Sequence, residues 1–154
     1  MLKNRSNNFL FASVFGLGTA PVASGTVASL VAGVPCFLLI GHLSAFAQLL
    51  ISIFIFLIGW YVSTEVEYEL GRTDPGEVVI DELCGFLVAM IGHPVSLLSV
   101  TAGFFLFRLF DIWKPWPLRF LERNLKRGLG IMMDDVGAGI YANILGLVIL
   151  KLLS

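Results

Sequence analysis

Apolar runs separated by short polar segments make up most of the chain. Residues 45–62 carry no charge and come close to the roughly 20 residues that a helix needs to cross a bilayer. Residues 136–153 form a second long apolar run, in which Ala138, Ala142 and Gly146 recur every four positions, a spacing that lets membrane helices pack closely. Both runs therefore predict transmembrane helices.

Further helices are predicted by three shorter apolar runs, at residues 27–40, 83–92 and 95–110. The first contains Pro35 and is short for a crossing, so we expect it to be extended at one end or shielded by other parts of the protein. His93-Pro94 separates the other two, which predicts either a helical hairpin or one kinked helix. The pattern predicts an all-α fold: an integral membrane bundle with several short transmembrane or membrane-embedded helices, in a single domain over residues 1–154.

The polar segments between the runs predict where helices end. Residues 41–44 have the composition of a turn before the first long run, and residues 71–76 that of a break after it. Glu65 and Glu69 lie four positions apart within residues 64–70, which predicts that the long helix continues beyond the membrane up to that break.

The composition agrees with a membrane protein. Of the 154 residues, 57% are hydrophobic and only 14% are charged, whereas roughly 25% of the residues in soluble domains are charged. The formal net charge of −1 gives no overall basic character of the kind that accompanies nucleic-acid binding, so we expect no nucleic-acid partner.

The uneven distribution of charge predicts a topology. Lys3 and Arg5 favour a cytoplasmic N-terminus, and the six basic residues between positions 108 and 127 favour the cytoplasm as well. If Glu82 and Arg108 both lie on the cytoplasmic side, the chain between them crosses the membrane an even number of times or not at all. This favours a helical hairpin over one kinked helix for residues 83–110. The polar segments meet at the cytoplasmic face of a multi-pass protein.

The two histidines fall outside this polar face. His42 and His93 are placed at the opposite ends of their hairpins. The topology therefore argues against histidine catalysis.

Two pairs of adjacent acids precede apolar runs. Asp81-Glu82 stands before one run and Asp134-Asp135 before the last. Either pair alone can be explained as a cap that complements the positive end of a helix. Together they favour a cation site, because an ionised carboxylate beside hydrocarbon is costly unless it is paired or binds a cation. Oxygen ligands without a Cys or His cluster favour Mg²⁺ over Zn²⁺.

A basic and acidic cluster lies at the end of the second hairpin run. Arg108, Asp111 and Lys114 recur at three-residue intervals, which places them on one side of a helix end. The cluster is either an ion-paired helix terminus or a phosphate site, in which the cations hold the phosphate and Asp111 orients them or joins the metal site. Pro115 and Pro117 end this helix.

A glycine-rich segment at residues 16–26 precedes the first short apolar run. Gly25 and Thr26 offer a backbone N–H and a hydroxyl close to a positive helix end, an arrangement that can hold a phosphate. Glycines also serve tight turns and close helix packing, so both interpretations stay open.

Four sequence blocks resemble the motifs of the phosphatidylglycerophosphatase A family. They are GLGTAPVASGTVASL at residues 16–30, VIDELCG at 79–85, FRLFDIWKPWP at 107–117 and GLGIMMDDVGAG at 128–139. Their order and spacing resemble the family over nearly the whole chain. The chain departs from the family at Ser24, Ala28 and Arg127, where Pro, Gly and Gly are usual, but every acidic motif position is filled.

The resemblance implies an Mg²⁺-dependent, all-helical enzyme of the bacterial inner membrane, which converts phosphatidylglycerophosphate to phosphatidylglycerol and inorganic phosphate in phospholipid biosynthesis. The expected catalytic residues are Asp81, Asp111, Asp134 and Asp135, the expected metal ligands are Asp81, Glu82, Asp134 and Asp135, and the expected phosphate-binding residues are Gly25, Thr26, Arg108 and Lys114. The alternatives are a small cation transporter that uses interfacial carboxylates and a phosphatase for another lipid phosphate. The acids lie beside rather than within the spans, and basic residues lie nearby. Both features favour a phosphatase over a cation transporter.

Overall fold

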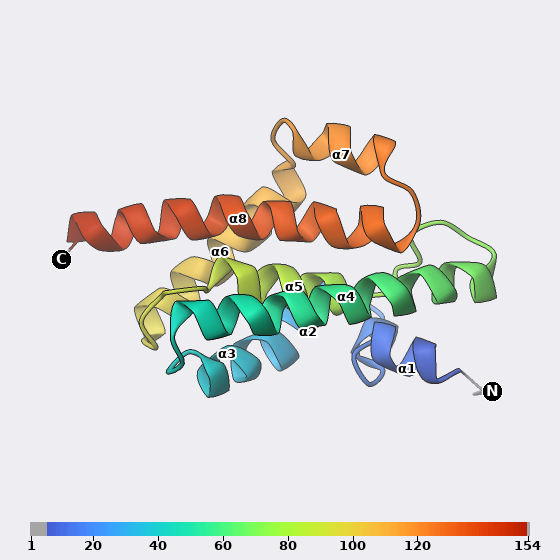
Figure 1. The fold of residues 1–154 in the computed structure, drawn as a ribbon, viewed down its shortest axis with the longest axis horizontal. Coiled ribbons are helices and arrows are strands. Elements are labelled where there is room, and N and C mark those ends of the chain that lie inside the picture. The colour runs from blue at the N-terminus through green and yellow to red at the C-terminus, as the bar shows by residue number, and fades with distance from the viewer. Residues whose placement is uncertain (1–5, 154) are drawn as a thin grey trace.

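The computed structural model describes residues 6–153, apart from the side chains of residues 121–123 and 153, and every regular element in that range is helical (Figure 1). The elements are α1 (Asn7–Ala12), a 3₁₀ turn (Leu17–Thr19), α2 (Ser24–Ala28), a π-helical segment (Ser29–Gly33), α3 (Val34–Ile40), α4 (Ala45–Leu70), α5 (Ile80–Ala89), α6 (Leu97–Trp113), α7 (Leu118–Asn124) and α8 (Gly128–Leu153). The predicted all-α fold is confirmed.

The helices α4 and α8 are long and apolar enough to cross a membrane. Only 22% and 28% of their most apolar stretches are buried inside the protein, unlike a core helix of a soluble protein, which is mostly covered. The predicted continuation of the first span is confirmed, because α4 runs without a break to Leu70 and ends at Gly71, whose φ of 64° suits glycine. The remaining described helices are shorter, so two helices rather than several reach membrane-spanning length.

The shorter apolar runs form the predicted helices with shifted ends. The run predicted at 27–40 begins three residues earlier, so that α2, the π-helical segment and α3 form one helical stretch. The helices α5 and α6 make the predicted hairpin, with a non-helical connection at residues 90–96 that rules out one kinked helix. Both pack more extensively against α8 than against each other. Phe86 and Phe107 are fully buried and meet edge to face between them.

One end of the bundle joins the α3–α4 turn to the α5–α6 connection. The Gln48 side chain donates to the Leu43 carbonyl at 2.9 Å and accepts from the Gly92 N–H at 3.0 Å. On α8, a Cβ added at Gly146 would lie 2.6 Å from Nε2 of His93, so the helix touches the imidazole ring. The predicted position of the histidines, away from the acid pairs, is confirmed.

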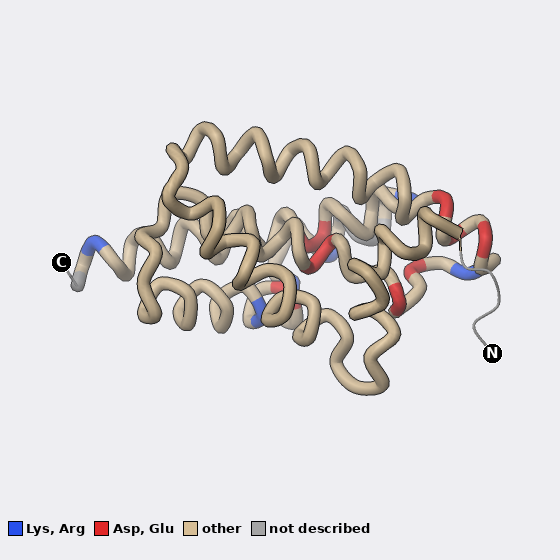
Figure 2. Tube along the Cα trace, turned by 90° about the horizontal axis from the view of Figure 1, so that it is seen from below, with Lys and Arg blue, Asp and Glu red and all other residues tan. Residues whose placement is uncertain are grey.

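The other end carries one of two groups of charged residues (Figure 2). Arg127 lies over the ring of Tyr68, with 4.3 Å from its guanidinium carbon to the ring centroid, and thereby joins the segment before α8 to the end of α4. Figure 2 shows charged positions gathered at this end and in a group near the middle of the molecule. Lys3 and Arg5, on which the predicted orientation relied, lie outside the described residues.

Candidate active site

Two glycines bring α5 and α8 into backbone contact. A Cβ added at Gly139 would lie 2.3 Å from the Gly85 carbonyl oxygen, and one at Gly85 would lie 2.6 Å from the Asp135 carbonyl oxygen. Asp81 and Asp135 each stand four residues before one of these glycines, on the same face of their helices. The close approach of the helices therefore sets their carboxylates against each other.

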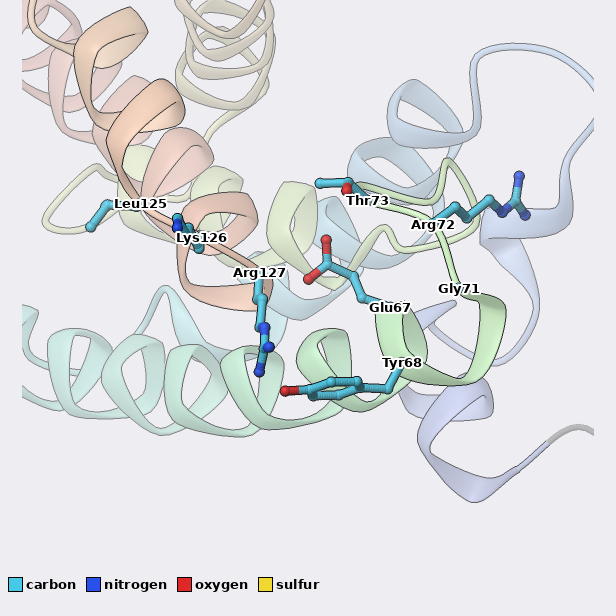
Figure 3. A pocket seen from close by; sticks show the side chains of 8 residues that line it. All are labelled: Glu67, Tyr68, Gly71, Arg72, Thr73, Leu125, Lys126 and Arg127. Carbon is cyan, nitrogen blue, oxygen red and sulfur yellow. The ribbon is translucent and has the colours of Figure 1, made fainter.

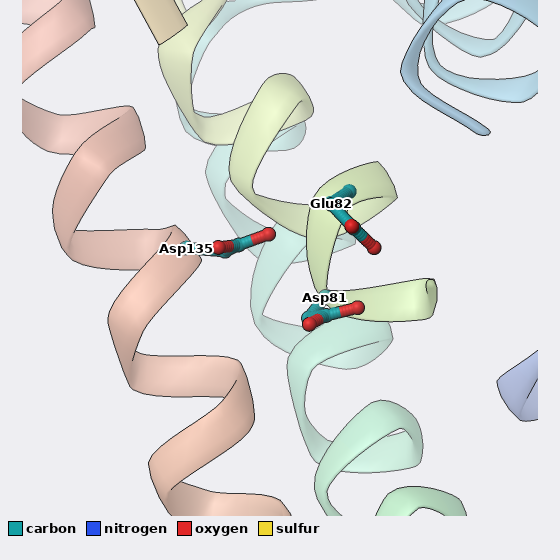
Figure 4. A group of neighbouring side chains, drawn as sticks. All are labelled: Asp81, Glu82 and Asp135. Carbon is teal, nitrogen blue, oxygen red and sulfur yellow. The ribbon is translucent and has the colours of Figure 1, made fainter. Parts of the chain in front are cut away.

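Two groups of carboxylates meet at Asp135. In one group, oxygen atoms of Asp81, Glu82 and Asp135 all lie within 4.8 Å of one another, and in the other the same holds for Asp111, Asp134 and Asp135. Figure 4 shows Asp135 projecting from α8 toward the two acids at the start of α5. These groups could hold a metal ion, and Asp135 is common to both.

The hydrogen bonds that these carboxylates make within the protein do not compensate the cost of burying them. Asp81 is 8% exposed and Asp135 4% exposed, and one carboxylate oxygen on each of Asp81, Glu82 and Asp135 has no hydrogen-bond partner among the described residues. Burial raises the pKa of Asp81 well above its usual range, and the charges of Glu82 and Asp135 raise it further. Burial also raises the pKa of Glu82, against the lowering effects of Asp81 and Arg108. Buried acids in this state fit a bound cation.

The structure corrects the expected position of Asp134 and Asp135. They were expected immediately before the last helix, but α8 begins at Gly128 and includes both, more than one turn from its start. A helix-capping role is therefore excluded for this pair. Asp81 and Glu82 do lie in the first turn of α5, where Val79 provides no side-chain cap.

Both expected cations pair with acids of the second group. Arg108 makes an ion pair with Asp111 at 2.8 Å within α6. Lys114 ends α6 with a φ of 45° and makes an ion pair with Asp134 on α8. The prediction that Arg108, Asp111 and Lys114 share one side of a helix end agrees with this geometry. Their role in phosphate binding stays a prediction.

The glycine-rich segment reaches the acids through Gly25. A Cβ added there would lie 1.9 Å from Oε1 of Glu82, so only glycine allows the first turn of α2 to approach so closely. The Ser24 hydroxyl donates to the Gly76 carbonyl at 3.0 Å and fastens this turn to the segment before α5. Thr26 is half-buried beside Gly25. Phosphate binding by Gly25 and Thr26 stays a prediction.

Sequence reasoning missed Glu67. It is 8% exposed, one of its oxygens accepts from the Asp74 N–H at 2.9 Å, and Oε2 has no hydrogen-bond partner among the described residues. It lines a pocket of about 480 Å³ (Figure 3) and also a smaller one of about 70 Å³ that reaches Asp134. The signal was its spacing, because Gly59, Ser63 and Glu67 recur every four positions on the buried face of α4.

Comparison with known proteins gives a consistent family. A family model described as "Phosphatidylglycerophosphatase A" matches residues 10–150. The chain is 37% identical over 134 residues to phosphatidylglycerophosphatase A of Escherichia coli K12, covering 86% of this chain and 77% of that protein. The protein of that name from Haemophilus influenzae Rd is also 37% identical over 134 residues, with 86% and 82% covered.

A relative with a different name is equally similar. The chain is 37% identical over 145 residues to a "putative phosphatidylinositol-3-phosphatase" of Bacteroides thetaiotaomicron, covering 88% of this chain and 89% of that protein. No solved structure matches the chain. Because the family model covers nearly all of the sequence, and all four motif blocks lie within the matched residues, the chain belongs to the phosphatidylglycerophosphatase A family.

Proposed function

We propose that this phosphatase converts phosphatidylglycerophosphate to phosphatidylglycerol and inorganic phosphate, with Mg²⁺ as its cofactor, at the cytoplasmic face of a bacterial inner membrane. The observation that carries the proposal is the meeting of two carboxylate groups at Asp135, with Arg108 and Lys114 paired to members of the second group. The names of the two phosphatidylglycerophosphatase A relatives support the choice of substrate.

The metal would be held by Asp81, Glu82, Asp134 and Asp135. Carboxylate oxygens are hard ligands of the kind that Mg²⁺ prefers, and Asp81, Glu82 and Asp135 each have one oxygen without a hydrogen-bond partner among the described residues. Bound there, Mg²⁺ would neutralise charge on the transferring phosphate and favour ionisation of a water nucleophile. Asp111 belongs to the same carboxylate group as Asp134 and can serve as a further ligand.

The remaining residues act on the phosphate itself. Phosphoryl transfer depends mainly on positioning and on positive charge around the equatorial oxygens. Arg108 and Lys114 supply that charge, while Asp111 and Asp134 hold their side chains at the site until the phosphate arrives. Gly25 borders Glu82 and Thr26 follows it in the chain, so a backbone N–H and a hydroxyl could donate to a phosphoryl oxygen there.

The structure leaves one of the two sequence arguments against a cation transporter. Asp134 and Asp135 lie within α8, so the placement of the acids beside the spans no longer excludes an ion pathway. The ion pairs of Arg108 and Lys114 still oppose it, because fixed positive charges beside the carboxylates repel a passing cation.

A phosphoinositide is the second candidate substrate. The relative from Bacteroides thetaiotaomicron is as similar as the others but is named a putative phosphatidylinositol-3-phosphatase. Like phosphatidylglycerophosphate, a phosphatidylinositol phosphate carries a phosphomonoester on a polyol beyond the phosphodiester. The same acid and cation groups could act on either headgroup.

Phosphate release from defined lipids tests the proposal. The full chain, purified in detergent, is given phosphatidylglycerophosphate or phosphatidylinositol 3-phosphate in mixed micelles, with Mg²⁺ or with a chelator. We expect faster hydrolysis of phosphatidylglycerophosphate, which stops with the chelator and returns when Mg²⁺ is added. A preference for the phosphoinositide would change the substrate, and no release from either lipid would overturn the proposal.

The orientation in the membrane needs a separate test. Single cysteines at positions 42 and 76, in a variant without Cys36 and Cys84, report the two ends of the bundle. Position 76 should react with a membrane-impermeant reagent only from the cytoplasmic side and position 42 only from the other. Labelling of both positions from one side would contradict the proposed topology.

A further inference from the structure

A pocket at the charged end of the bundle has no role in the chemistry described so far. It measures about 480 Å³ and lies between the end of α4 and the segment before α8 (Figure 3). Its lining includes three cations, Arg72, Lys126 and Arg127. Arg72 is engaged by Glu77 at 2.5 Å, so Lys126 and Arg127 provide the cationic wall.

The opposite wall carries a buried carboxylate. Glu67 is more than nine-tenths buried, its Oε2 has no hydrogen-bond partner among the described residues, and Figure 3 shows its carboxylate directed into the space between Arg127 and Thr73. A simple anion would be repelled by that carboxylate, and a simple cation by Arg127 and Lys126. The ligand must offer acceptors to one wall and a hydrogen-bond donor to the other.

Arg127 supports a specific use of the pocket. Its φ of 60° lies in the left-handed region that favours glycine. An arginine there carries a conformational cost that a glycine would not. Its side chain is held over the Tyr68 ring and lines the pocket.

We infer that this pocket is a second phosphate site, separate from the acid cluster, and that it binds inorganic phosphate. Near neutral pH, inorganic phosphate keeps at least one P–OH group, which can donate to Oε2 of Glu67 while its other oxygens accept from Arg127 and Lys126. Sulfate has no such hydrogen, and a phosphomonoester, whose second pKa is about 6, has mostly lost it.

The pocket is placed to receive product, a point that rests on the proposed function. Glu67 and Arg127 also line the smaller pocket of about 70 Å³, which Asp134 lines as well. The smaller pocket therefore lies between Asp134 of the acid cluster and two residues that line the larger pocket. The binding itself does not depend on which lipid is hydrolysed.

Calorimetric titration of the full chain in detergent tests the site, with a chelator present so that no metal contributes. Inorganic phosphate should bind at least about tenfold more tightly than sulfate or glycerol 3-phosphate, because one charge-assisted hydrogen bond separates them. Arg127→Gly should weaken phosphate binding by about tenfold, Arg127→Lys should restore part of it, and Lys151→Ala, at the far end of α8, should change nothing.

Glu67→Gln gives the sharpest outcome. The single amide oxygen is needed by the Asp74 N–H, so the atom facing the pocket becomes a donor, and the preference for phosphate over sulfate should disappear. Helical content and the unfolding temperature check that each variant is folded. A retained preference in Glu67→Gln, unchanged binding in Arg127→Gly, or tighter binding of glycerol 3-phosphate than of phosphate would overturn the inference. Lipid hydrolysis measured in parallel is an independent result, because its absence would remove the proposed function and leave the phosphate site standing.

Discussion

Asp135→Asn removes one charge at the point where both carboxylate groups meet and preserves the shape of the side chain. Asp135 is 4% exposed, and in the described structure its Oδ2 has no hydrogen-bond partner. If the site holds a divalent cation, the Asp135 carboxylate contributes to activity when the metal is bound. Without the metal, the buried charge destabilises the folded protein. The substitution should therefore change stability and activity in opposite directions.

The size of the stability change follows from the separation of the carboxylates. Oxygen atoms in each group lie within 4.8 Å of one another, and two ionised carboxylates at that distance repel by about 3 kcal/mol at an effective dielectric constant of about 20. Protonation of one partner removes part of this repulsion. We expect metal-free Asp135→Asn to be about 1 to 3 kcal/mol more stable than the parent, a rise of several degrees in unfolding temperature.

The activity should fall at the same time. Loss of one charged ligand removes an interaction of about 1.5 to 3 kcal/mol, which corresponds to a loss of about tenfold or more in turnover at limiting Mg²⁺. The unfolding temperature is measured in detergent with a chelator, and turnover as phosphate release from the lipid with Mg²⁺. Glu65→Gln on α4, outside both carboxylate groups, is the matched loss of one charge and should change neither.

Two results would refute this reasoning. If metal-free Asp135→Asn is less stable than the parent, the carboxylate has a protein partner that compensates its burial. If turnover at limiting Mg²⁺ is unchanged, Asp135 is not a metal ligand, and its position between the two carboxylate groups does not contribute to catalysis.

Three further predictions concern the neighbours of this residue. Arg108→Ala and Lys114→Ala should each lower turnover by about tenfold through loss of a charge-assisted phosphate contact, and near-normal activity of both would assign the two ion pairs to structure alone. Gly25→Ala should lower turnover by about tenfold or more, because the added Cβ must displace Glu82, whereas Gly76→Ala meets no atom within 4 Å and should be silent. Because burial raises the pKa of Asp81, the metal-free folded state keeps a proton that the unfolded state loses above about pH 4, so its unfolding temperature should fall as pH rises from there. The stabilisation by Mg²⁺ should grow over the same range, since the metal requires ionised ligands, and a Mg²⁺ effect that shrinks as pH rises would contradict this.

The long helices could be predicted from the sequence because membrane-spanning segments follow from local apolar composition. The start of α8 could not, since residues 128–135 mix glycine with two acids and look like a loop. A Cβ added at Gly128 would lie 2.5 Å from the Trp60 carbonyl oxygen, so glycine lets the helix begin directly against α4. That contact between distant segments is invisible in a local pattern.

The sequence predicted which residues form the candidate site, but not which of them lie next to one another. The motif blocks identified the acids and cations, yet only the backbone contact at Gly85 and Gly139 makes Asp135 common to both carboxylate groups. Glu67 was missed because the spacing of Glu65 and Glu69 predicted only that the helix continues beyond the membrane. Its own periodicity with Ser63 placed it on the buried face of the same helix.

The position of Asp134 and Asp135 inside α8 has a consequence for how the lipid meets the enzyme. The two acids lie more than a turn below the start of a helix that is apolar enough to span the bilayer. If α8 crosses the bilayer, as its length and composition allow, the phosphate of a lipid substrate would have to reach below the start of that helix to meet these acids. Because both acids are buried, electrostatic contacts to a phosphate beside them would be stronger than at an open surface.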